Sequence, residues 1–365
     1  MNASTFPIRR PCDFHTHLRS IAEIGKSAFK MVVRHNTAHY RYVVAEPNTH
    51  LDANDPKHHI ETAEDVKRYR DQVLQVPNRN PHCTFLFLAK LTPRTTPRMV
   101  EQVLEAGAIG FKLYPDGVTT GSEHGGVSDF HTPQLYDCLH VLEERKAILQ
   151  EHPELPRAFS MRREWEYGNV VRRHAEAFPT LRIFAEHLSD RRSLSLLELP
   201  NVYGTITGHH LRLTLDDVLG QSDHFCRPNA KEPEDRDALV EIALSGNKKV
   251  ISITDSAYHS WSRKHLLACG CAGIFNPAAV AIPWLVTLWE QHGGATDAAK
   301  LVSLESFTTL NGCVAYNLEP PKQEDVIWLA RTPWEVPRLY FPSTYIDEAA
   351  TPFLAGETLP VKIVG

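Results

Sequence analysis

Cys12-Asp-Phe-His-Thr-His17 is a short β-prone segment that ends in two histidines separated by one residue. Because successive side chains of a strand point to opposite faces, we predict that His15 and His17 point to the same side and can share a metal ion. A solvent-facing strand that happens to carry two histidines is the alternative explanation of this motif taken alone. The rest of the chain must decide between the two.

Seven further β-prone segments follow, and stretches with apolar residues at positions i, i+3 and i+4 lie between most of them. We predict strands at residues 12–17, 42–46, 84–89, 110–114, 157–161, 182–187, 202–207 and 250–254, and helices at 61–76, 98–106, 238–244, 278–291 and 296–310. Alternation of strands and helices is typical of a parallel sheet. Eight such units predict the α/β class and a (β/α)8 TIM-type barrel. An open doubly wound sheet would be expected to carry a Gly-rich phosphate loop after its first strand, where this sequence has none.

The composition of the 365 residues is that of an ordinary globular protein, with 42% hydrophobic and 23% charged residues. The net charge of −5 gives no general attraction to nucleic acid or to an anionic membrane. We expect residues 1–365 to form a single domain, with the C-terminal helices and tail (about 277–365) packing on the barrel.

The N-terminus lacks the apolar segment of a secretory signal, and the longest apolar stretch, residues 277–286, is about half as long as a membrane-spanning helix. Seven cysteines, an odd number, fit a reducing compartment better than a disulfide framework. Cys269-Gly-Cys271 is too tightly spaced for a zinc knuckle. These features predict a cytoplasmic protein.

Polar side chains of the kinds that bind metals or substrates follow the predicted strands. They are His15, His17, Asn48, Lys112, His187 and Asp255. Each has a structural alternative when taken singly: a strand lysine can pair with a carboxylate, for example, and a histidine can be a hydrogen-bonded core residue. In a barrel of this kind, however, the carboxyl ends of the strands meet at one mouth, where active sites form. We therefore expect these side chains to converge.

Several motifs resemble the amidohydrolase superfamily, and more closely the dihydroorotase family in its shorter, monofunctional form. The segments that carry the resemblance are Asp13-Phe-His-Thr-His-Leu-Arg19, Pro47-Asn48, Lys112-Leu-Tyr-Pro-Asp-Gly-Val-Thr-Thr120, Thr207-Gly-His-His-Leu211, Thr254-Asp-Ser-Ala-Tyr-His259, Cys269-Gly-Cys-Ala-Gly273 and Pro352-Phe-Leu-Ala-Gly-Glu357. They run in the family's order from residue 11 to the C-terminus. The resemblance implies a TIM barrel that reversibly interconverts dihydroorotate and N-carbamoyl-aspartate, a step of pyrimidine biosynthesis.

The resemblance also implies a zinc centre. His15, His17 and Asp255 would hold one Zn²⁺, and Lys112, as N6-carboxylysine, would bridge it to a second Zn²⁺ that His187 also binds. A carbamate forms only on a neutral amine, and burial beside cations is what lowers a lysine pKa. Asp255 would pass a proton to the leaving ring nitrogen.

The implied substrate contacts lie in three other segments. Arg19, Asn48 and His259 would hold the substrate carboxylate, a task suited to a guanidinium. Thr119 and Thr120 would form the tip of a mobile loop, and the Ala272 backbone would contact the ring. The implied partners are this small substrate and a second copy of the chain, with neither nucleic acid nor membrane.

Three positions depart from the family pattern. The second-zinc histidine after the fifth strand aligns with Ser160, or with Met161 if the alignment slips by one residue, and neither is a normal zinc ligand. Glu46 replaces a methionine before Pro47-Asn48, and Tyr258 replaces a proline before His259. Three interpretations stay open. The chain is a dihydroorotase with one tight metal or with water in the vacant position, an amidohydrolase for another small cyclic amide or ureido acid, or a catalytically silent homologue that binds a ligand or a partner protein.

Overall fold

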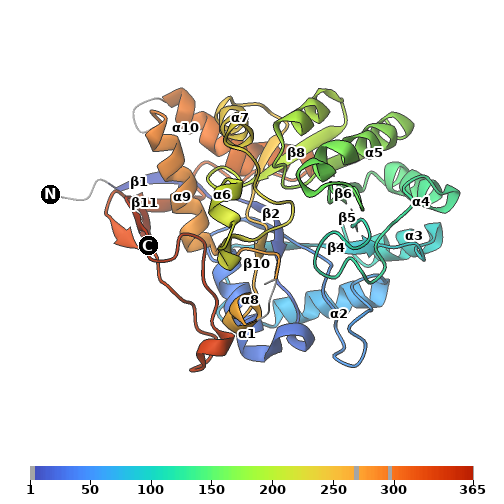
Figure 1. Cartoon of the computed structure of the whole chain (residues 1–365), viewed down its shortest axis with the longest axis horizontal. Helices are drawn as coiled ribbons and strands as arrows, with labels where there is room; N and C mark the ends of the chain where they lie inside the picture. Colours follow the sequence, from blue (N-terminus) through green and yellow to red (C-terminus); the bar gives the residue numbers. More distant parts are fainter. Residues whose placement is uncertain (1–4, 267–270, 295–297, 365) are drawn as a thin grey trace.

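The computed structural model describes residues 5–266, 271–294 and 298–364. Its centre is a curled sheet of parallel strands surrounded by helices (Figure 1). The strands are β2 (Asp13–His17), β3 (Tyr42–Ala45), β4 (Thr84–Leu91), β5 (Gly110–Leu113), β6 (Ile148–Glu151), β7 (Arg182–Ala185), β8 (Val202–Thr207), β9 (Val250–Ile253) and β10 (Ser256–Ala257). Each strand from β2 to β8 pairs in parallel with the next strand along the chain, as predicted for a (β/α)8 barrel.

The barrel closes between its last and first strands. The chain leaves β9, turns at Asp255 and pairs as β10 in parallel with β2, where Ser256 lies opposite Thr16. The backbone N–H of Asp255 also donates to the His15 carbonyl at 3.0 Å. Closure therefore brings two of the predicted site residues together through the main chain itself.

The predicted fifth strand is wrong. Residues 157–161 form a turn that leads into a 3₁₀ helix, η1 (Ser160–Arg162). The fifth barrel strand is β6, which lies between β5 and β7 in the sheet. The other seven predicted strands correspond to β2–β5 and β7–β9, with bounds that differ by at most two residues.

Helices connect the strands on the outside of the barrel (Figure 1). They are α1 (Ile21–Thr37), α2 (Ala63–Leu74), α3 (Pro97–Glu105), α4 (Pro133–Glu144), α5 (Arg163–Ala177), the 3₁₀ helix η2 (Arg191–Glu198), α6 (Leu215–Val218), the 3₁₀ turn η3 (Ser222–His224) and α7 (Pro233–Leu244). The short Thr-Pro dipeptides explain two of the starts. The Thr96 and Thr132 hydroxyls accept from backbone N–H groups of the first turn, and the following proline already has a helical φ angle.

The chain after the barrel forms α8 (Trp261–His265), α9 (Ala278–Gln291), α10 (Ala298–Glu305), the π-helical turn η4 (Ser306–Leu310) and α11 (Asn311–Ala315). It ends in β11 (Val326–Ala330), β12 (Trp334–Glu335), the turn η5 (Ile346–Glu348), β13 (Thr358–Leu359) and β14 (Lys362–Val364). Strand β11 pairs with both β14 and the N-terminal strand β1 (Thr5–Arg9), while β12 pairs with β13. The two ends of the described chain thus share one small antiparallel sheet beside the barrel.

An apolar cluster fills the barrel below its mouth. The Tyr316 ring, which follows α11, lies 4.5 Å from the Phe14 ring and 4.3 Å from the Phe184 ring between centroids. A Cβ on Gly312 would come within 2.1 Å of the Phe14 ring, so only glycine permits this approach of α11. The end of the barrel opposite the mouth is therefore sealed by a C-terminal helix.

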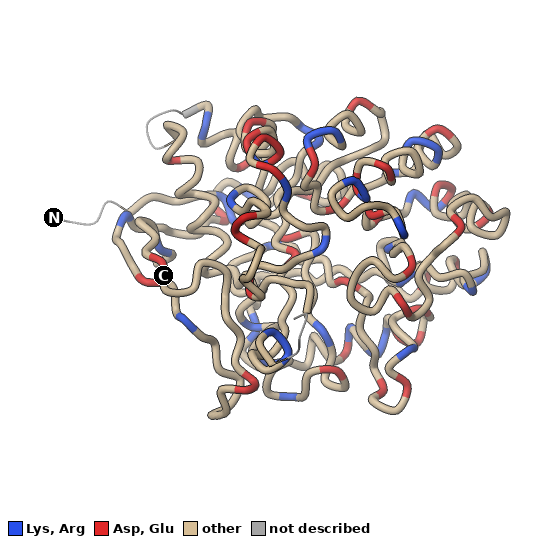
Figure 2. Tube along the Cα trace, viewed as in Figure 1, with Lys and Arg blue, Asp and Glu red and all other residues tan. Residues whose placement is uncertain are grey.

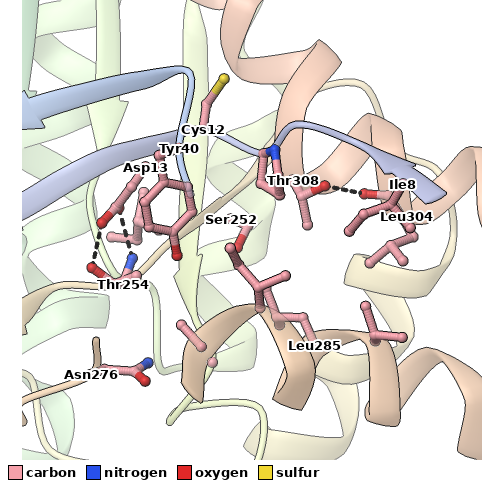
Figure 3. A pocket seen from close by; sticks show the side chains of 16 residues that line it. Ile8, Cys12, Asp13, Tyr40, Ser252, Thr254, Asn276, Leu285, Leu304 and Thr308 are labelled. Carbon is pink, nitrogen blue, oxygen red and sulfur yellow. Dashed lines mark hydrogen bonds between the residues drawn. The ribbon is translucent and has the colours of Figure 1, made fainter. Parts of the chain in front are cut away.

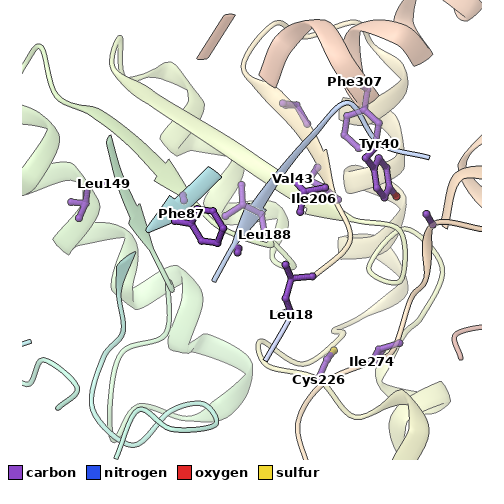
Figure 4. Packing of buried hydrophobic residues seen from close by; sticks show 14 of the residues in the cluster. Leu18, Tyr40, Val43, Phe87, Leu149, Leu188, Ile206, Cys226, Ile274 and Phe307 are labelled. Carbon is purple, nitrogen blue, oxygen red and sulfur yellow. The ribbon is translucent and has the colours of Figure 1, made fainter. Parts of the chain in front are cut away.

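A larger apolar layer lies between the sheet and the helices. Figure 4 shows part of it, with Val43, Phe87 and Leu149 from three barrel strands among the buried side chains. Basic and acidic residues are interspersed along the outer helices (Figure 2). Among the described residues, no helix is long and apolar enough to cross a membrane.

Asp13 joins the two strands that close the barrel. Its carboxylate accepts from the Thr254 backbone N–H at 2.9 Å and from the Thr254 hydroxyl at 2.5 Å, beside a cavity of about 10 Å³ next to α9 (Figure 3). That volume is close to the space of a single water molecule.

Candidate active site

A pocket opens at the carboxyl ends of the barrel strands. Its lining residues are His15, His17, Arg19, Asn48, Tyr114, Thr119, Thr120, His152, His187, Arg227, Asp255, Ala257, Ala272 and Gly273. Of the residues predicted from sequence, Lys112 lies just below the pocket beside His15, and His259 contacts Arg19 at its edge. The predicted site residues thus converge at the mouth, with the exception of Ser160.

His15, His17 and Asp255 form a buried cluster. One Asp255 oxygen lies 3.3 Å from His15 Nε2 and 2.9 Å from His17 Nε2. The potential ligand atoms of the three residues all lie within 4.8 Å of one another. Burial opposes ionisation of Asp255, but hydrogen bonds from the two histidines outweigh it and hold its pKa well below the usual value. This carboxylate is therefore ionised and aimed at two imidazoles.

The far nitrogens of both histidines are held by side chains around them. His15 Nδ1 lies 2.5 Å from Glu186 Oε2, and His17 Nδ1 lies 2.7 Å from Asn48 Oδ1. These contacts leave the Nε2 atoms facing Asp255. Such outer contacts fix the ring orientation and tautomer of metal-binding histidines.

Three residues at the mouth have strained backbones. Arg19, His187 and Asp255 have φ angles of 59°, 40° and 45°, in the left-handed region that side chains other than glycine rarely adopt. Each directly follows, or lies within two residues of, the end of a barrel strand. Strain of this kind is commonly retained at functional sites because it aims a side chain.

A second group of potential ligands lies next to the first. The His152 ring lies 4.6 Å from the His187 ring, and the His187 ring lies 5.2 Å from the His15 ring. His187 Nδ1 is buried and has no hydrogen-bond partner among the described residues. The Lys112 ammonium is fully buried, 3.4 Å from His15 Nδ1.

His152 corrects the prediction for Ser160. His152 directly follows the fifth strand β6, and its Nε2 lies 2.9 Å from Glu154 Oε2, so its other nitrogen is free to face the pocket. Ser160 lies outside the pocket lining, and its hydroxyl accepts from Arg227 Nη1 at 3.0 Å and Asn229 Nδ2 at 2.9 Å. The prediction placed the fifth strand at residues 157–161, whereas the structure places it at Ile148–Glu151, and the residue after it is a histidine. The available signal was the histidine at the end of Ile148-Leu149-Gln150-Glu151-His152, which follows two strongly apolar residues by three positions.

Glu46 faces inward. Its carboxylate is 1% exposed, lies 3.6 Å from both Lys112 Nζ and His15 Nδ1, and accepts from the Tyr114 hydroxyl at 2.8 Å. Burial alone would raise the pKa of Glu46, but the nearby His15 and Lys112 lower it below the usual value. Burial alone would lower the pKa of His15, but the carboxylates of Glu46 and Glu186 outweigh it and raise this pKa to about 10. Glu46 thus supplies the partner that the buried lysine needs.

The predicted substrate-binding residues surround a buried guanidinium. Arg19 is 2% exposed, and its Nη2 lies 3.2 Å from His259 Nε2, whereas Nε and Nη1 have no hydrogen-bond partner among the described residues. His259 Nε2 also lies 3.0 Å from the Ala272 carbonyl. Burial, followed by the charge of Arg19, keeps the pKa of His259 well below its usual value. The site therefore presents a cation with unused donors, which suits a carboxylate ligand.

The loop that carries Thr119 and Thr120 extends over this pocket. The Thr120 hydroxyl lies 3.4 Å from the Ala272 carbonyl, and the Thr120 carbonyl accepts from Asn48 Nδ2 at 3.2 Å. The buried Lys90 ammonium, which the sequence did not point to, donates to the Gly121 carbonyl at 3.0 Å and to the His124 carbonyl. Burial lowers the pKa of Lys90 to about 8. The loop is anchored from below and linked to the opposite rim.

The donor set fits a pair of divalent ions. Four histidines, one carboxylate and one buried lysine converge, and His187 Nδ1 has no hydrogen-bond partner among the described residues. Imidazole with carboxylate is a common zinc ligand set. Besides Lys90, the sequence did not point to four lining or supporting residues, His152, Tyr114, Glu186 and Arg227.

Known proteins resemble this chain over nearly its whole length. No protein-family model matches it. A dihydroorotase from Helicobacter hepaticus is 34% identical over 323 residues, which are 86% of each chain. The structure of a dihydroorotase from Campylobacter jejuni superposes with a TM-score of 0.84 at 29% identity, over 100% of this chain and 99% of the other. A dihydroorotase from Saccharomyces cerevisiae in complex with 5-fluoroorotic acid gives 0.85 at 25% identity, over 99% and 98%.

Proposed function

The chain belongs to the dihydroorotase family, and on that premise we propose that it catalyses the reversible, metal-dependent hydrolysis of dihydroorotate to N-carbamoyl-aspartate. The observation that carries the proposal is the position of His152. It follows the fifth barrel strand and packs against His187, which supports a role as the second histidine ligand of the second metal. The other two interpretations, a diverged amidohydrolase and a silent homologue, rested on a vacancy at Ser160 and lose that support.

Two groups of residues would hold the metals. His15, His17 and Asp255 would bind one Zn²⁺; His152, His187 and carboxylated Lys112 would bind the second, with the carbamate between them. When bound, zinc supplies Lewis acidity, which makes hydroxide available near neutral pH and polarises a carbonyl. Lys112 is buried beside His15 and Glu46, where its modification would place an anion next to the ligand nitrogens.

The chain's own residues account for binding and proton transfer. Arg19, Asn48 and His259 would bind the substrate carboxylate. Arg19 would use Nε and Nη1, which have no hydrogen-bond partner among the described residues, although Nη1 lies 3.6 Å from Glu23 Oε1. Asp255, kept ionised by the two histidines, would take the proton of the attacking water and give it to the ring nitrogen as the amide bond breaks. The loop with Thr119 and Thr120 would exclude bulk water, and the Ala272 backbone would contact the ring.

Three further assignments belong to the same proposal. A homodimer rests on the family resemblance alone. A cytoplasmic location is supported by the free thiols of the six described cysteines. A single catalytic domain is supported by the pairing of β1 with β11, which ties the N-terminal strand to the C-terminal region.

The test is turnover of dihydroorotate and of N-carbamoyl-aspartate by the purified protein, before and after addition of zinc and bicarbonate, with the zinc content measured on the same samples. We expect turnover in both directions and two zinc ions per chain. Binding of dihydroorotate without turnover in the zinc-loaded protein would refute the proposal and favour the silent homologue.

A further inference from the structure

Arg227 is a second guanidinium in the pocket, and none of the roles above uses it. It lies in the connection between β8 and α7, and its side chain is 23% exposed and lines the pocket. Its Nη1 donates to the Ser160 hydroxyl at 3.0 Å, and its guanidinium carbon lies 5.3 Å from the centre of the Phe225 ring. These contacts hold the side chain in place by one nitrogen and one face.

The remaining donors of Arg227 are available to a ligand. Within the described ranges, neither Nε nor Nη2 has a protein hydrogen-bond partner. The nearest carboxylate is Glu154, whose Oε1 lies 3.9 Å from Nη1, while Glu154 Oε2 is already paired with His152 at 2.9 Å. Arg227 and His152 therefore share Glu154 as a neighbour, which places Arg227 on the side of the pocket that holds the proposed metal ligands.

The two substrates of the proposed reaction differ by one negative charge. Dihydroorotate carries a single carboxylate at neutral pH. Water adds to its ring carbonyl, the carbon–nitrogen bond breaks, the nitrogen keeps one proton of the water and the other is released. The product, N-carbamoyl-aspartate, therefore carries two carboxylates. On the proposed function, the new one would form where the ring carbonyl is attacked, near the proposed second-zinc ligands His152 and His187.

We propose that Arg227 forms a second anion subsite, which binds the carboxylate created by ring opening and so favours the open dianion over the cyclic monoanion. The inference rests on the proposed function and extends it. Arg19 would hold the carboxylate that both substrates share, and Arg227 the one that only the open form has. A planar guanidinium with two adjacent free N–H groups matches a carboxylate in shape as well as charge.

Kinetics alone cannot isolate this effect. The equilibrium constant of the reaction fixes the ratio of kcat/KM in the two directions, so any variant changes both by the same factor. Binding of non-reacting probes separates them. Succinate carries two carboxylates on the four-carbon chain of aspartate, and orotate carries one carboxylate on the pyrimidine ring.

The experiment is calorimetric titration of the zinc-loaded protein with succinate and with orotate, in the wild type and in Arg227→Gln, Arg227→Lys and Ser160→Ala. We expect Arg227→Gln to weaken succinate about tenfold and orotate less than twofold, because one charge-assisted contact is lost only with the dianion. Arg227→Lys should restore most of the preference. Ser160→Ala, which removes the support of Nη1 but keeps the charge, should weaken succinate by about twofold.

Equal weakening of both probes, or no change in either, would overturn the proposal, and thermal unfolding of each variant checks that it is folded. Because binding is measured without turnover, an inactive protein with the expected probe preference would contradict the proposed reaction and leave the anion subsite standing. An active protein in which Arg227→Gln does not change the preference between the probes would support the proposed reaction and refute the anion subsite.

Discussion

Replacement of His152 by alanine tests the corrected ligand set most directly. Four-ligand zinc sites have apparent binding free energies of about 10–16 kcal/mol, so one ligand accounts for roughly 2.5–4 kcal/mol. At about 1.4 kcal/mol per factor of ten, His152→Ala should weaken the second zinc by roughly 60- to 700-fold. The substitution should also leave the fully buried Glu154 without its hydrogen-bond partner His152. This loss should lower the free energy of unfolding by about 1–3 kcal/mol.

The assay is zinc content per chain after dialysis against a weak chelator, with urea unfolding on the same protein. We expect two zinc ions in the wild type and one in His152→Ala, with turnover reduced at least a hundredfold. His174→Ala is the matched control. His174 is equally buried and lies 2.9 Å from Glu151 Oε1, but it does not line the pocket. It should therefore destabilise the protein to a similar extent without loss of zinc.

Ser160→His provides the opposing test. Ser160 lies outside the pocket and supports Arg227, so a histidine there should leave the zinc content unchanged. If Ser160→His raises the zinc content, or His152→Ala keeps both ions, the assignment of β6 as the strand that presents the ligand is wrong.

Three other substitutions probe the grip, the loop and the barrel closure. Arg19→Met should weaken dihydroorotate binding by about 2–5 kcal/mol, since the substrate carboxylate loses its buried cation; unchanged affinity in a titration would exclude Arg19 from the grip. Lys90→Met should raise the KM for dihydroorotate about tenfold, because two loop carbonyls lose a charged donor, whereas Lys26→Met on an exposed position should not. Burial raises the pKa of Asp13 to about 7, so the native state holds a proton that the unfolded chain has released, and stability falls as pH rises from about 4 to 7. The loss amounts to up to about 4 kcal/mol in the free energy of unfolding, and Asp13→Asn should lack it. Urea unfolding at about pH 4 and about pH 7, in the presence of a chelator, measures it. Identical pH dependence of the two proteins would contradict the argument.

Local sequence patterns were sufficient for seven of the eight barrel strands and for most of the site. The predicted helix at 278–291 coincides with α9, and His15, His17 and Asp255 meet as expected. Strand ends recur at fixed places in this fold, so the residue type that follows a strand predicts its place at the mouth. The predicted helix at 296–310 appears as α10 and η4 over residues 298–310, and residues 296 and 297 lie outside the described ranges.

The sequence pattern did not predict the fifth strand because two of its four residues are polar. It reads Ile-Leu-Gln-Glu, yet Gln150 and Glu151 are fully buried. Gln150 donates to the Tyr316 hydroxyl at 2.7 Å, and Glu151 is paired with His174 and the Tyr167 hydroxyl. A buried polar group is stable only with such partners, and these come from other elements of the fold.

The sequence by itself determined the order of the barrel units and the types of polar residue that follow most strands, because each is encoded in a short local pattern. Only the tertiary structure decided that His152 and not Ser160 follows the fifth strand, that Glu46 faces Lys112, and that Arg227 lines the pocket. The physical reason is common to all three. The free energy of burying a polar or charged side chain depends on partners supplied by distant segments, and folding alone brings those partners together.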